Sequence, residues 1–364
     1  MQKRVVQTSG IEVGLEKEAT EEIVQILQST TYGIEGRLRY SHIDTQDRIK
    51  ATQNLSFFQI KRYQRILGIA GVIKRSTLGV TGTVTALYIR YLSMPGAFKK
   101  KPTSRIGHKP KQGVLRGFLS DMFTQLEQDV PDEEKAVFYA VVERDNIPSQ
   151  NMCKMNGFEK VRQMDTHLFS RFKPREHAYI RAIKEVDQPE FEKQLFEFYQ
   201  KHTLVFTDTL FTEGKCMVAE RDGKIVGGIK GRPVKWELLE VPGFSGFLML
   251  KVLPYVPYLK RLFDKRYVRF VALEALWVSE GYEKEIEPLM EAMCAYYKEH
   301  IGILWSDSES PIAHLIRKFV VLGFMSKVQK NVPADLLIRF IDTPDEEKKV
   351  YRNSPMYISA GDMT

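Results

Sequence analysis

A glycine at the start of an amphipathic helix is the feature of this sequence best suited to chemistry. Gly113 lies in Pro110-Lys111-Gln112-Gly113-Val114-Leu115-Arg116, directly before a stretch whose apolar residues recur on one helical face. The free backbone N–H groups and the dipole at a helix start attract anions, and glycine allows a phosphate to approach the backbone closely. The segment therefore predicts an anion site, such as one for the phosphates of a cofactor.

The loop before this glycine is strongly basic. Its cations, with no acid among them, are Lys99, Lys100, Lys101, Arg105, Lys109, Lys111 and Arg116. Such a cluster suits an anionic partner, which can be cofactor phosphates, RNA or an acidic lipid surface. A solvated loop is the alternative interpretation. The whole chain has 54 Lys and Arg against 46 Asp and Glu, so much of its net charge of +8 lies here.

Several common catalytic and metal-binding motifs are missing. The seven histidines show no HExxH or HxH spacing, and Cys153, Cys216 and Cys294 form no CxxC or CxxH pair. No GxSxG, GxxxxGK(S/T) or GxGxxG occurs. We therefore expect no metal site and no disulfide scaffold, and we find no support for hydrolase, P-loop or dinucleotide-binding chemistry.

The elements that must position the glycine occur twice along the chain. Residues 57–71 and 217–229 each contain two apolar runs joined by a four-residue polar connection, and each second run opens with Ile-(Leu/Val)-Gly. This pattern predicts a β-hairpin in each copy. A strand and an amphipathic helix precede each hairpin, and a longer strand follows it, at 85–94 and 269–278.

Each copy then continues with a helix, a strand, a short helix, a Gly-Phe pair and a last strand. The pairs Gly157-Phe158 and Gly323-Phe324 lie 166 residues apart, close to the 159 residues between the two hairpin glycines. The order β-α-β-β-β-α-β-α-β thus occurs twice. Both glycines are placed for left-handed helix stops, and Ser310 with Pro311 predicts a helix start.

We expect an α+β (α/β) protein of two modules, each a mixed, mostly antiparallel central sheet flanked by helices. The first spans 1–174 and is the candidate for cofactor binding, the second spans 175–345, and 346–364 form a C-terminal tail. The joint falls at the polar, proline-containing stretch 173–176. A length of 364 residues with 43% hydrophobic residues suits two sizeable cores and argues against disorder.

The location expected from the sequence is the cytoplasm. The first ten residues contain no apolar core of a signal peptide, and the dispersed cysteines suit a reducing compartment. The most apolar stretch, 244–263, is interrupted by charges and prolines, so we expect no membrane span. We favour an insertion that packs on the second copy. The alternatives are the lining of an acceptor pocket, a dimer interface and a membrane-surface segment.

The order of elements and the residues before the first Gly-Phe pair resemble the GNAT superfamily, the acyl-coenzyme-A-dependent N-acyltransferases. Family members commonly show Asn, Ala three residues on, then Leu-Tyr, three residues and Gly-Phe. This chain follows that register without a gap, with Asn146, Ser149, Met152, Cys153, Gly157 and Phe158. In element order the resemblance covers nearly the whole chain.

The resemblance implies acetyl-CoA, or another acyl-CoA, as co-substrate. The family holds the pyrophosphate at a (Gln/Arg)-x-x-Gly-x-(Gly/Ala) turn. Gly113 matches the first glycine of that turn, whereas Leu115 replaces the second small residue. The cofactor-binding residues that the resemblance implies are Leu92, Met94, Lys111, Gln112, Gly113, Val114, Leu115, Arg116 and Asn146.

The resemblance also implies where protons are exchanged. The family often places a Tyr four residues before the Gly of Gly-Phe as acid for the thiolate, and here that position is Cys153. The candidate catalytic residues are Cys153, Glu143 after the fifth strand and Tyr88 within the fourth. The alternatives are a core role for Cys153 and an ion pair between Glu143 and Arg144. Glu274 is a candidate buried carboxylate of the second copy.

The second copy has lost the glycine turn. At the position equivalent to that of Gly113 it has Tyr282-Glu283-Lys284-Glu285-Ile286-Glu287, with glutamate at both small positions. Two carboxylates would repel a pyrophosphate, and their side chains would block the approach to the backbone. We therefore expect a lapsed cofactor site in this copy.

We expect an N-acyltransferase, with acetyl as the first choice of acyl group, that acts on a small-molecule or peptide amine. One alternative is a binding or regulatory protein that keeps the fold without the chemistry, because the family Tyr is missing in both copies. Another is an aminoacyl transferase that uses charged tRNA, although the long helical arm usual in such enzymes is absent. Nucleic acid is therefore not an expected partner, and a homodimer stays open.

Overall fold

The computed structural model describes residues 3–8, 11–33, 36, 38–63, 65–93, 112–128, 130–131, 134–241, 243, 246, 251–264, 266–328 and 333–363. The first half contains all the predicted elements and adds β1, β3 and α2. Its strands are β1 (Lys3–Thr8), β2 (Ile11–Glu16), β3 (Arg39–His42), β4 (Leu55–Arg62), β5 (Arg65–Thr77), β6 (Val84–Ser93), β7 (Ala136–Glu143) and β8 (Glu159–Ser170). Its helices are α1 (Glu21–Gln28), α2 (Thr45–Ala51), α3 (Gln112–Gln128) and α4 (Ile147–Met155).

The second half repeats this order. Its strands are β9 (Ile180–Ala182), β10 (Lys215–Arg221), β11 (Lys224–Glu240), β12 (Tyr267–Val278), β13 (Ile301–Asp307) and β14 (Ala334–Phe340). Its helices are α5 (Gln188–Tyr199), α7 (Ile286–Tyr297), α8 (Pro311–Phe319), α9 (Met325–Val328), α10 (Asp345–Asn353) and α11 (Ala360–Met363). A short helix that the sequence did not predict, α9, comes between the Gly-Phe pair and the last strand, β14.

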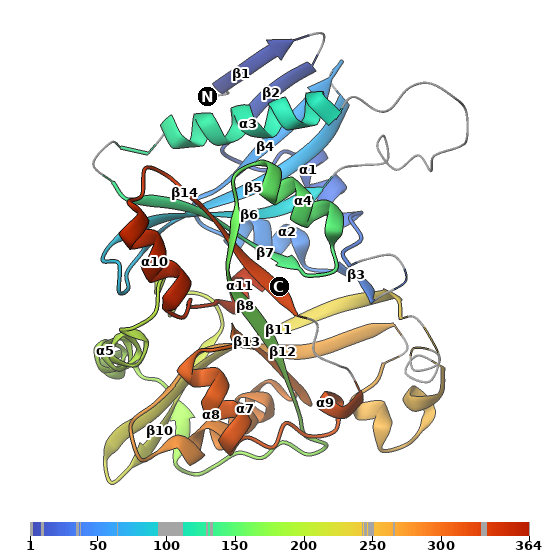
Figure 1. Ribbon diagram of the computed structural model, residues 1–364. Coiled ribbons are helices and arrows are strands. Elements are labelled where there is room, and N and C mark those ends of the chain that lie inside the picture. The colour runs from blue at the N-terminus through green and yellow to red at the C-terminus, as the bar shows by residue number, and fades with distance from the viewer. Residues whose placement is uncertain are drawn as a thin grey trace.

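The two halves share one sheet (Figure 1). Within the described ranges, fourteen strands have the order β1-β2-β4-β5-β6-β7-β14-β8-β13-β12-β11-β10-β9, with β3 paired to β11 off this path. Only β6/β7 and β12/β13 are recorded as parallel pairs, so the predicted mixed, mostly antiparallel sheet is confirmed. The last strands are exchanged: β14 pairs with β7 of the first copy, and β8 pairs with β13 of the second. The limits 1–174 and 175–345 stay a prediction.

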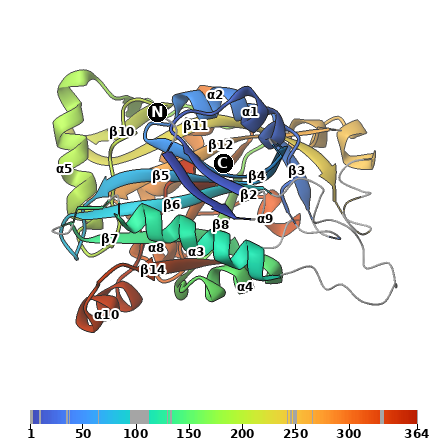
Figure 2. The same ribbon diagram turned by 90° about the horizontal axis from the view of Figure 1, so that it is seen from above.

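Helices cover both faces of the first half (Figure 2). Adjacent residues of β4 point to opposite faces, as the period of a strand requires. Phe57 packs in one core with Ile23 and Leu27 of α1, while Phe58 packs in another with Met122 of α3. Both phenylalanines are fully buried. The sequence around the first hairpin is therefore apolar at successive positions because both faces of its strands are covered.

The same backbone irregularity occurs in both copies. Tyr91 in β6 and Ala275 in β12 have positive φ angles of 55° and 51°. The register of the neighbouring strand shifts beside each of them, between Ile69 and Gly71 and between Gly228 and Lys230. A non-glycine residue rarely adopts this conformation within a strand. Its occurrence at equivalent places supports the internal duplication.

Of the three predicted helix ends and starts, two are confirmed and the third differs. Gly157 has a φ of +80° directly after Asn156, the C-cap of α4, as predicted. Ser310 caps α8, since its side chain accepts a hydrogen bond from the N–H of Ala313. Gly323 also has a positive φ, but α8 ends earlier, at Phe319. There a Cβ would lie 2.2 Å from the carbonyl oxygen of Ser170, so glycine serves a close backbone contact.

The C-terminal segment is part of the core. Met356, Tyr357, Ile358, Ser359 and Ala360 are all buried. The segment runs between the two halves, and the chain end lies near the centre of the molecule (Figure 1). The stretch predicted as a tail thus has a packed structure. In addition, no helix among the described residues is long and apolar enough to cross a membrane.

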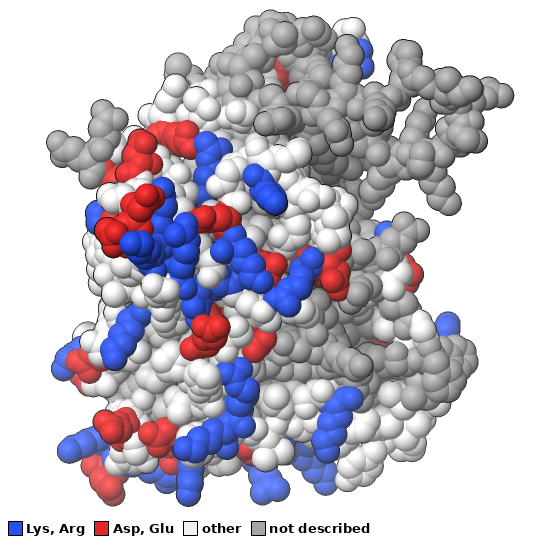
Figure 3. Space-filling view, in the orientation of Figure 1, with Lys and Arg blue, Asp and Glu red and all other residues white. Residues whose placement is uncertain are grey.

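Lys and Arg side chains are interspersed with Asp and Glu on the face that Figure 3 shows. One exposed ion pair of the protein joins Arg352 and Glu159, which lie 2.6 Å apart with 44% and 39% of their side chains exposed. Exposed pairs of this kind contribute only about 0–1 kcal/mol each. They nevertheless prevent a field of one sign on this face.

Candidate functional site

The central cavity lies where two parallel strands separate. β6 and β7 pair from Thr85 opposite Ala136 to Tyr88 opposite Tyr139, and both strands continue beyond that point. Residues 89–92 of β6 and 140–143 of β7 line a cavity of about 1090 Å³. A gap of this kind lets a ligand meet backbone groups of both strands, which form strong hydrogen bonds.

Both copies contribute to the walls of this cavity. Leu119, Met122 and Phe123 of α3 line it on the side of the first copy. Its second-copy wall is largely apolar and contains Trp236, Leu262, Phe263, Val268, Ile303, Trp305 and Met325. The cavity therefore joins a part next to α3 and α4 with a part that the second copy encloses.

The strand β6 is distorted where it borders the cavity. Tyr91 holds a left-handed backbone conformation, and Gly71 of β5 lies against it. A Cβ at Gly71 would lie 3.1 Å from the Tyr91 ring and 3.2 Å from the carbonyl oxygen of Arg90. Such a bulge costs on the order of 1–3 kcal/mol and is common beside active sites, where it redirects a strand. The bulge therefore belongs to the candidate site.

Tyr88, a predicted catalytic residue, lines the cavity. Its hydroxyl donates a hydrogen bond of 2.6 Å to the carbonyl oxygen of Asp362 in the C-terminal segment. Its ring stacks on Tyr139 with a centroid distance of 4.7 Å. Burial raises the pKa of Tyr88, so the hydroxyl stays protonated. These contacts suit a side chain that holds the C-terminal segment against the cavity.

Cys153, predicted as the acid for the thiolate, also lines the cavity, from α4. Burial raises the pKa of its thiol to about 11. An ordinary thiol has a pKa of about 8.5, so proton transfer from Cys153 to a leaving thiolate would be uphill by roughly 3 kcal/mol. The position fits the prediction, but the acidity is poorly suited to that role.

Glu143 and Asn146 lie at the end of β7 and the start of α4, and both line the cavity. Asn146 is the N-cap of α4, where its side-chain oxygen accepts a hydrogen bond of 3.3 Å from Ser149 N–H. Burial first and the charge of Glu143 second raise the pKa of Tyr40. Glu143 therefore lies near Tyr40, and the ion pair seen for Arg144 is with Asp335.

The predicted cofactor-binding residues are placed to different extents. Leu92 lines the cavity with Asn146. Gln112, Gly113, Val114, Leu115 and Arg116 form the first turns of α3, although their side chains are outside the description. Met94 and Lys111 lie outside the described residues, as does most of the basic loop. The structure thus brings Tyr88, Leu92, Glu143, Asn146 and Cys153 to one cavity.

Tyr32, Tyr40 and His42 were not predicted as site residues, whereas Trp236, with Tyr255 and Tyr258, was a candidate for the lining of an acceptor pocket beside 244–263. Tyr32, Tyr40, His42 and Trp236 line the cavity, and Tyr40 stacks on Trp236 with a centroid distance of 4.2 Å. They meet because β3, from the first copy, pairs with β11 of the second. The stretch 39–42 lacks the alternation that would predict a strand. No signal in the sequence indicated this pairing.

This aromatic group has unused hydrogen-bonding capacity. The hydroxyls of Tyr32 and Tyr91 and the indole N–H of Trp236 are buried without a partner in the described part of the chain. Each such group costs about 1–3 kcal/mol until a partner is supplied. Burial and, secondly, Arg48 lower the pKa of His42 well below its ordinary value, so its ring is neutral near pH 7. A polar ligand group is therefore expected in this part of the cavity.

The equivalent gap in the second copy is filled. β12 and β13 pair from Val271 opposite Gly302 to Leu273 opposite Leu304, and the space beyond is only about 10 Å³. The C-terminal residues Met356, Tyr357 and Ile358 line that remnant. A space of this size barely holds one water molecule. The second copy therefore has no room for a cofactor in its gap.

A buried ion pair holds the C-terminal segment in this place. Lys230 and Glu274 lie 2.7 Å apart, with 2% and 6% of their side chains exposed. Glu274 also accepts hydrogen bonds from the hydroxyl of Ser359 and the N–H of Ala360. Burial alone would raise the pKa of Glu274, but the Lys230 ammonium outweighs it and lowers the value to about 2. The predicted buried carboxylate is thus an ionised anchor.

The glutamates at the start of α7 have structural partners. Glu285 accepts two hydrogen bonds from Arg221, of 2.7 and 3.0 Å, and Glu287 lies 2.6 Å from Arg171. Glu283 accepts a hydrogen bond from the N–H of Gly281, which lowers its pKa. These carboxylates occupy the place where an anion would bind in the first copy. The contacts support the expected lapse of this site.

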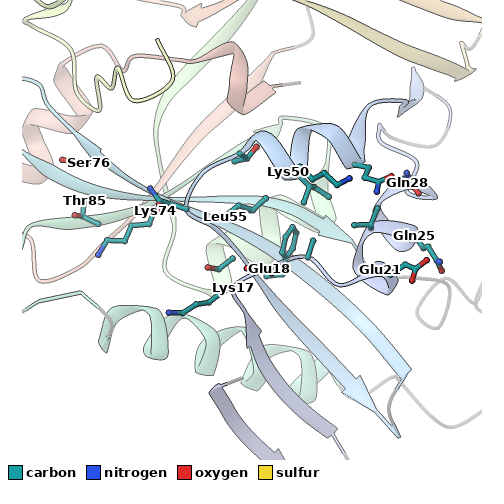
Figure 4. A pocket seen from close by; sticks show the side chains of 18 of the residues that line it. Lys17, Glu18, Glu21, Gln25, Gln28, Lys50, Leu55, Lys74, Ser76 and Thr85 are labelled. Carbon is teal, nitrogen blue, oxygen red and sulfur yellow. The ribbon is translucent and has the colours of Figure 1, made fainter. Parts of the chain in front are cut away.

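A second large groove is polar (Figure 4). It measures about 1250 Å³ and is bordered by α1, α2 and the strands β4 and β5. Lys17, Lys50, Glu18 and Glu21 are among its labelled side chains, so charges of both signs line it. Of the described residues in its lining, none is a cysteine or histidine. We therefore place the candidate site in the central cavity.

In both cavities and in the rest of the described ranges, no group of three or more His, Cys, Asp or Glu side chains is arranged to hold a metal ion.

Comparison with known proteins identifies the fold. No protein-family model and no curated protein matches the sequence. The structure is similar to that of N-myristoyltransferase from Saccharomyces cerevisiae with bound myristoyl-CoA and inhibitors. The TM-score is 0.56 and the identity 12%, over 97% of this chain and 87% of that chain. A structure of the same enzyme with myristoyl-CoA gives a TM-score of 0.54 and 11% identity, over 98% and 90% of the two chains.

A GCN5-related N-acetyltransferase from Anabaena variabilis is also similar, with a TM-score of 0.47 and 13% identity over 90% of this chain and 72% of that chain. The N-myristoyltransferase fold extends over nearly the whole of this chain. The chain therefore shares the fold of this N-acyltransferase, in agreement with the acyltransferase fold predicted from the sequence.

Proposed function

We propose that this protein transfers an acyl group from an acyl-coenzyme A to an amine, with the donor bound by the first copy. The observation that carries the proposal is the contrast between the two gaps. The gap beside β6 and β7 opens into about 1090 Å³, whereas the gap beside β12 and β13 leaves about 10 Å³. A fold with two equivalent gaps keeps only one of them open.

In this proposal the start of α3 holds the pyrophosphate. Gly113 lies in the first turn of α3, where N–H groups have no partner within the helix and the dipole favours an anion. Leu119, Met122 and Phe123 carry the same helix into the cavity wall. The thioester then lies beside the bulge at Tyr91, where backbone groups of the separated strands can stabilise the developing oxyanion.

The reaction needs a base for the amine. The nitrogen attacks the thioester carbonyl, the new N–C bond forms, and the C–S bond breaks to release the thiolate. We assign the amine proton to Glu143, which lines the cavity and lies near Tyr40. Cys153 forms part of the wall, since its raised pKa makes it a weaker acid than the thiol it would protonate. The acceptor amine then lies among Tyr32, Tyr40 and Trp236.

The cavity also has room for a donor longer than acetyl. An acetyl group is the first choice from the sequence, but Leu262, Phe263, Ile303 and Trp305 extend the apolar wall into the second copy. Each buried methylene contributes about 0.8 kcal/mol, or roughly fourfold in affinity. N-myristoyltransferase of yeast, which shares the fold, binds myristoyl-CoA. A medium- or long-chain acyl group is therefore the second candidate.

The experiment is a turnover assay with acetyl-, octanoyl- and myristoyl-CoA against a panel of amines and amino-terminal peptides. Acylated product is detected by mass spectrometry. Glu143→Gln should lower kcat/KM by a factor of about 10²–10⁴. It should also remove the fall of kcat/KM at low pH that protonation of a catalytic base causes. The control is Glu176→Gln, which removes a carboxylate from the exposed joint. Binding of a donor without any turnover would favour a non-catalytic binding protein. Equal activity of both variants would remove Glu143 from the mechanism.

A further inference from the structure

One segment of the second copy is not needed to connect its strands. In the first copy the six residues 78–83 join β5 to β6, whereas in the second the 26 residues 241–266 join the equivalent strands β11 and β12. Connections this long are usually functional. The segment's longest described part, 251–264, contains two short 3₁₀ turns, at Leu253–Tyr255 and Leu259–Arg261. It lies beyond the ends of β11 and β12, at the lower right of Figure 1.

This segment has an inner and an outer side. Leu262 and Phe263 are only 5% exposed and line the central cavity. On the outer side Tyr255 is 65% exposed, Tyr258 is 58% exposed, and Val252 and Val256 are each more than a third exposed. Exposed apolar residues are ordinary when single, but a group on one short segment marks an interaction surface.

The charges of residues 251–263 are of one sign, and the next residue, Asp264, accepts hydrogen bonds from the N–H groups of Arg266 and Tyr267. Lys251, Lys260 and Arg261 are exposed, and no acid occurs in 251–263. The guanidinium of Arg261 donates a hydrogen bond to the carbonyl oxygen of Phe172 and lies near the ring of Tyr258. Tyr258 packs edge-on against Phe172, so this part of the segment is fixed to the body of the protein. Pro254 and Pro257 restrict the backbone further.

We propose that residues 251–261 dock the protein on an anionic membrane surface. Tyrosines favour the depth of the lipid headgroups, where the ring is buried and the hydroxyl stays hydrated. Neighbouring cations add attraction to anionic lipids, at roughly fivefold in affinity for each Lys or Arg. A protein partner would require a complementary acidic surface with pockets for the tyrosines. The combination of shallow apolar side chains and unbroken positive charge favours the lipid surface.

Docking in this way has a consequence for the cavity. The same segment contributes Leu262 and Phe263 to the cavity wall, so the membrane would lie next to the part enclosed by the second copy. An apolar acyl chain or acceptor could then pass between lipid and cavity without crossing much water. The docking itself does not depend on the proposed acyl transfer.

The test is sedimentation of the full chain with vesicles of phosphatidylcholine plus phosphatidylglycerol and with vesicles of phosphatidylcholine alone. We expect binding to the mixed vesicles, at least tenfold weaker binding to the neutral ones, and release at high salt, which shortens the reach of charge interactions. Lys251→Ala with Lys260→Ala should weaken binding about 20- to 30-fold. Tyr255→Ser with Tyr258→Ser should abolish sedimentation.

The matched controls carry the same changes elsewhere. Tyr63→Ser removes a tyrosine that is 80% exposed, and Lys201→Ala with Lys224→Ala removes two exposed lysines. These variants should bind vesicles like the unmodified protein. No sedimentation with either vesicle would overturn the proposal, as would equal losses in variants and controls. Concentration-dependent self-association through Tyr255 and Tyr258 without vesicle binding would assign the surface to a second copy instead. Calorimetry with acyl-CoA on the tyrosine variant tests the proposed function separately.

Discussion

The ion pair between Lys230 and Glu274 permits a quantitative prediction for the C-terminal segment. The perturbation is Glu274→Gln, which keeps the shape of the side chain and removes its charge. Lys230, with 2% of its side chain exposed, would then be a buried cation without its counter-ion, held by neutral groups such as the carbonyl oxygen of Thr209. The anchor of Ser359 and Ala360 would weaken in the same step.

Two routes give a similar magnitude. The pKa of Glu274 is about 2 in the folded protein against an ordinary value of 4.5, and this difference corresponds to roughly 3 kcal/mol of stability at neutral pH. Removing one partner of a buried ion pair costs about 3–5 kcal/mol in other proteins. We therefore expect Glu274→Gln to reduce the free energy of unfolding by about 3–5 kcal/mol.

The sign of the pH dependence follows from the same value. Because the folded protein depresses the pKa of Glu274, its contribution is fully present above about pH 4.5 and is lost as the pH falls toward 2. The unmodified protein should therefore lose this stability in that window. Glu274→Gln should lack this part of the dependence.

The assay is urea denaturation followed by tryptophan fluorescence, together with carboxypeptidase digestion of the C-terminus. Lys230→Met with Glu274→Met removes both charges and should recover much of the loss, since an apolar pair needs no compensation. Glu220→Gln, which breaks the partly exposed pair with Arg181, should cost less than about 1 kcal/mol. The reasoning fails if Glu274→Gln costs no more than Glu220→Gln, or if the double variant is less stable than the single one.

Three further predictions concern the cavity. The rate of Cys153 alkylation by iodoacetamide should keep rising with pH up to about pH 11, because burial raises the pKa of this thiol to that value. A rate that levels off near pH 9 would show an ordinary thiol. Gly71→Ala should crowd Tyr91 and lower the free energy of unfolding by about 1–3 kcal/mol. Gly14→Ala is the control, because a Cβ there meets nothing closer than 3.8 Å. Equal losses of stability in the two variants would contradict the role of the bulge. Trp236→Phe removes an unpartnered indole N–H, so it should leave the free energy of unfolding within about 1 kcal/mol of normal while it raises the KM for the acceptor. A change in stability alone would remove Trp236 from the acceptor site.

The repeated order of elements could be predicted because it depends on local signals. Hairpin turns, the apolar face of α3 and the glycine after α4 are determined by residues that are close in the sequence. Each of them was found in the structure. Tyr88, Leu92, Glu143, Asn146 and Cys153 reach one cavity for the same reason. Their positions follow from the ends of adjacent parallel strands and the helix after them.

The features that were missed depend on contacts between distant residues. Nothing in the sequence of β8 or β14 indicates which neighbour each will pair with, so the strand exchange could not be predicted. β3 is only four residues long and acquires its place through β11. Residues 356–360 are too few to show a period, yet they fill the second gap because Glu274 and Lys230 hold them.

The central claim is that the open gap of the first copy binds the acyl donor at the start of α3. Calorimetric titration of acetyl-CoA and myristoyl-CoA into the unmodified protein, Gly113→Glu and Ser120→Glu tests it most directly. Ser120 is an exposed residue of the same helix, so its variant adds the same charge away from the first turn. We expect micromolar binding to the unmodified protein and to Ser120→Glu, and loss of binding in Gly113→Glu. Equal affinity for all three proteins, or no heat with any of them, would contradict the account.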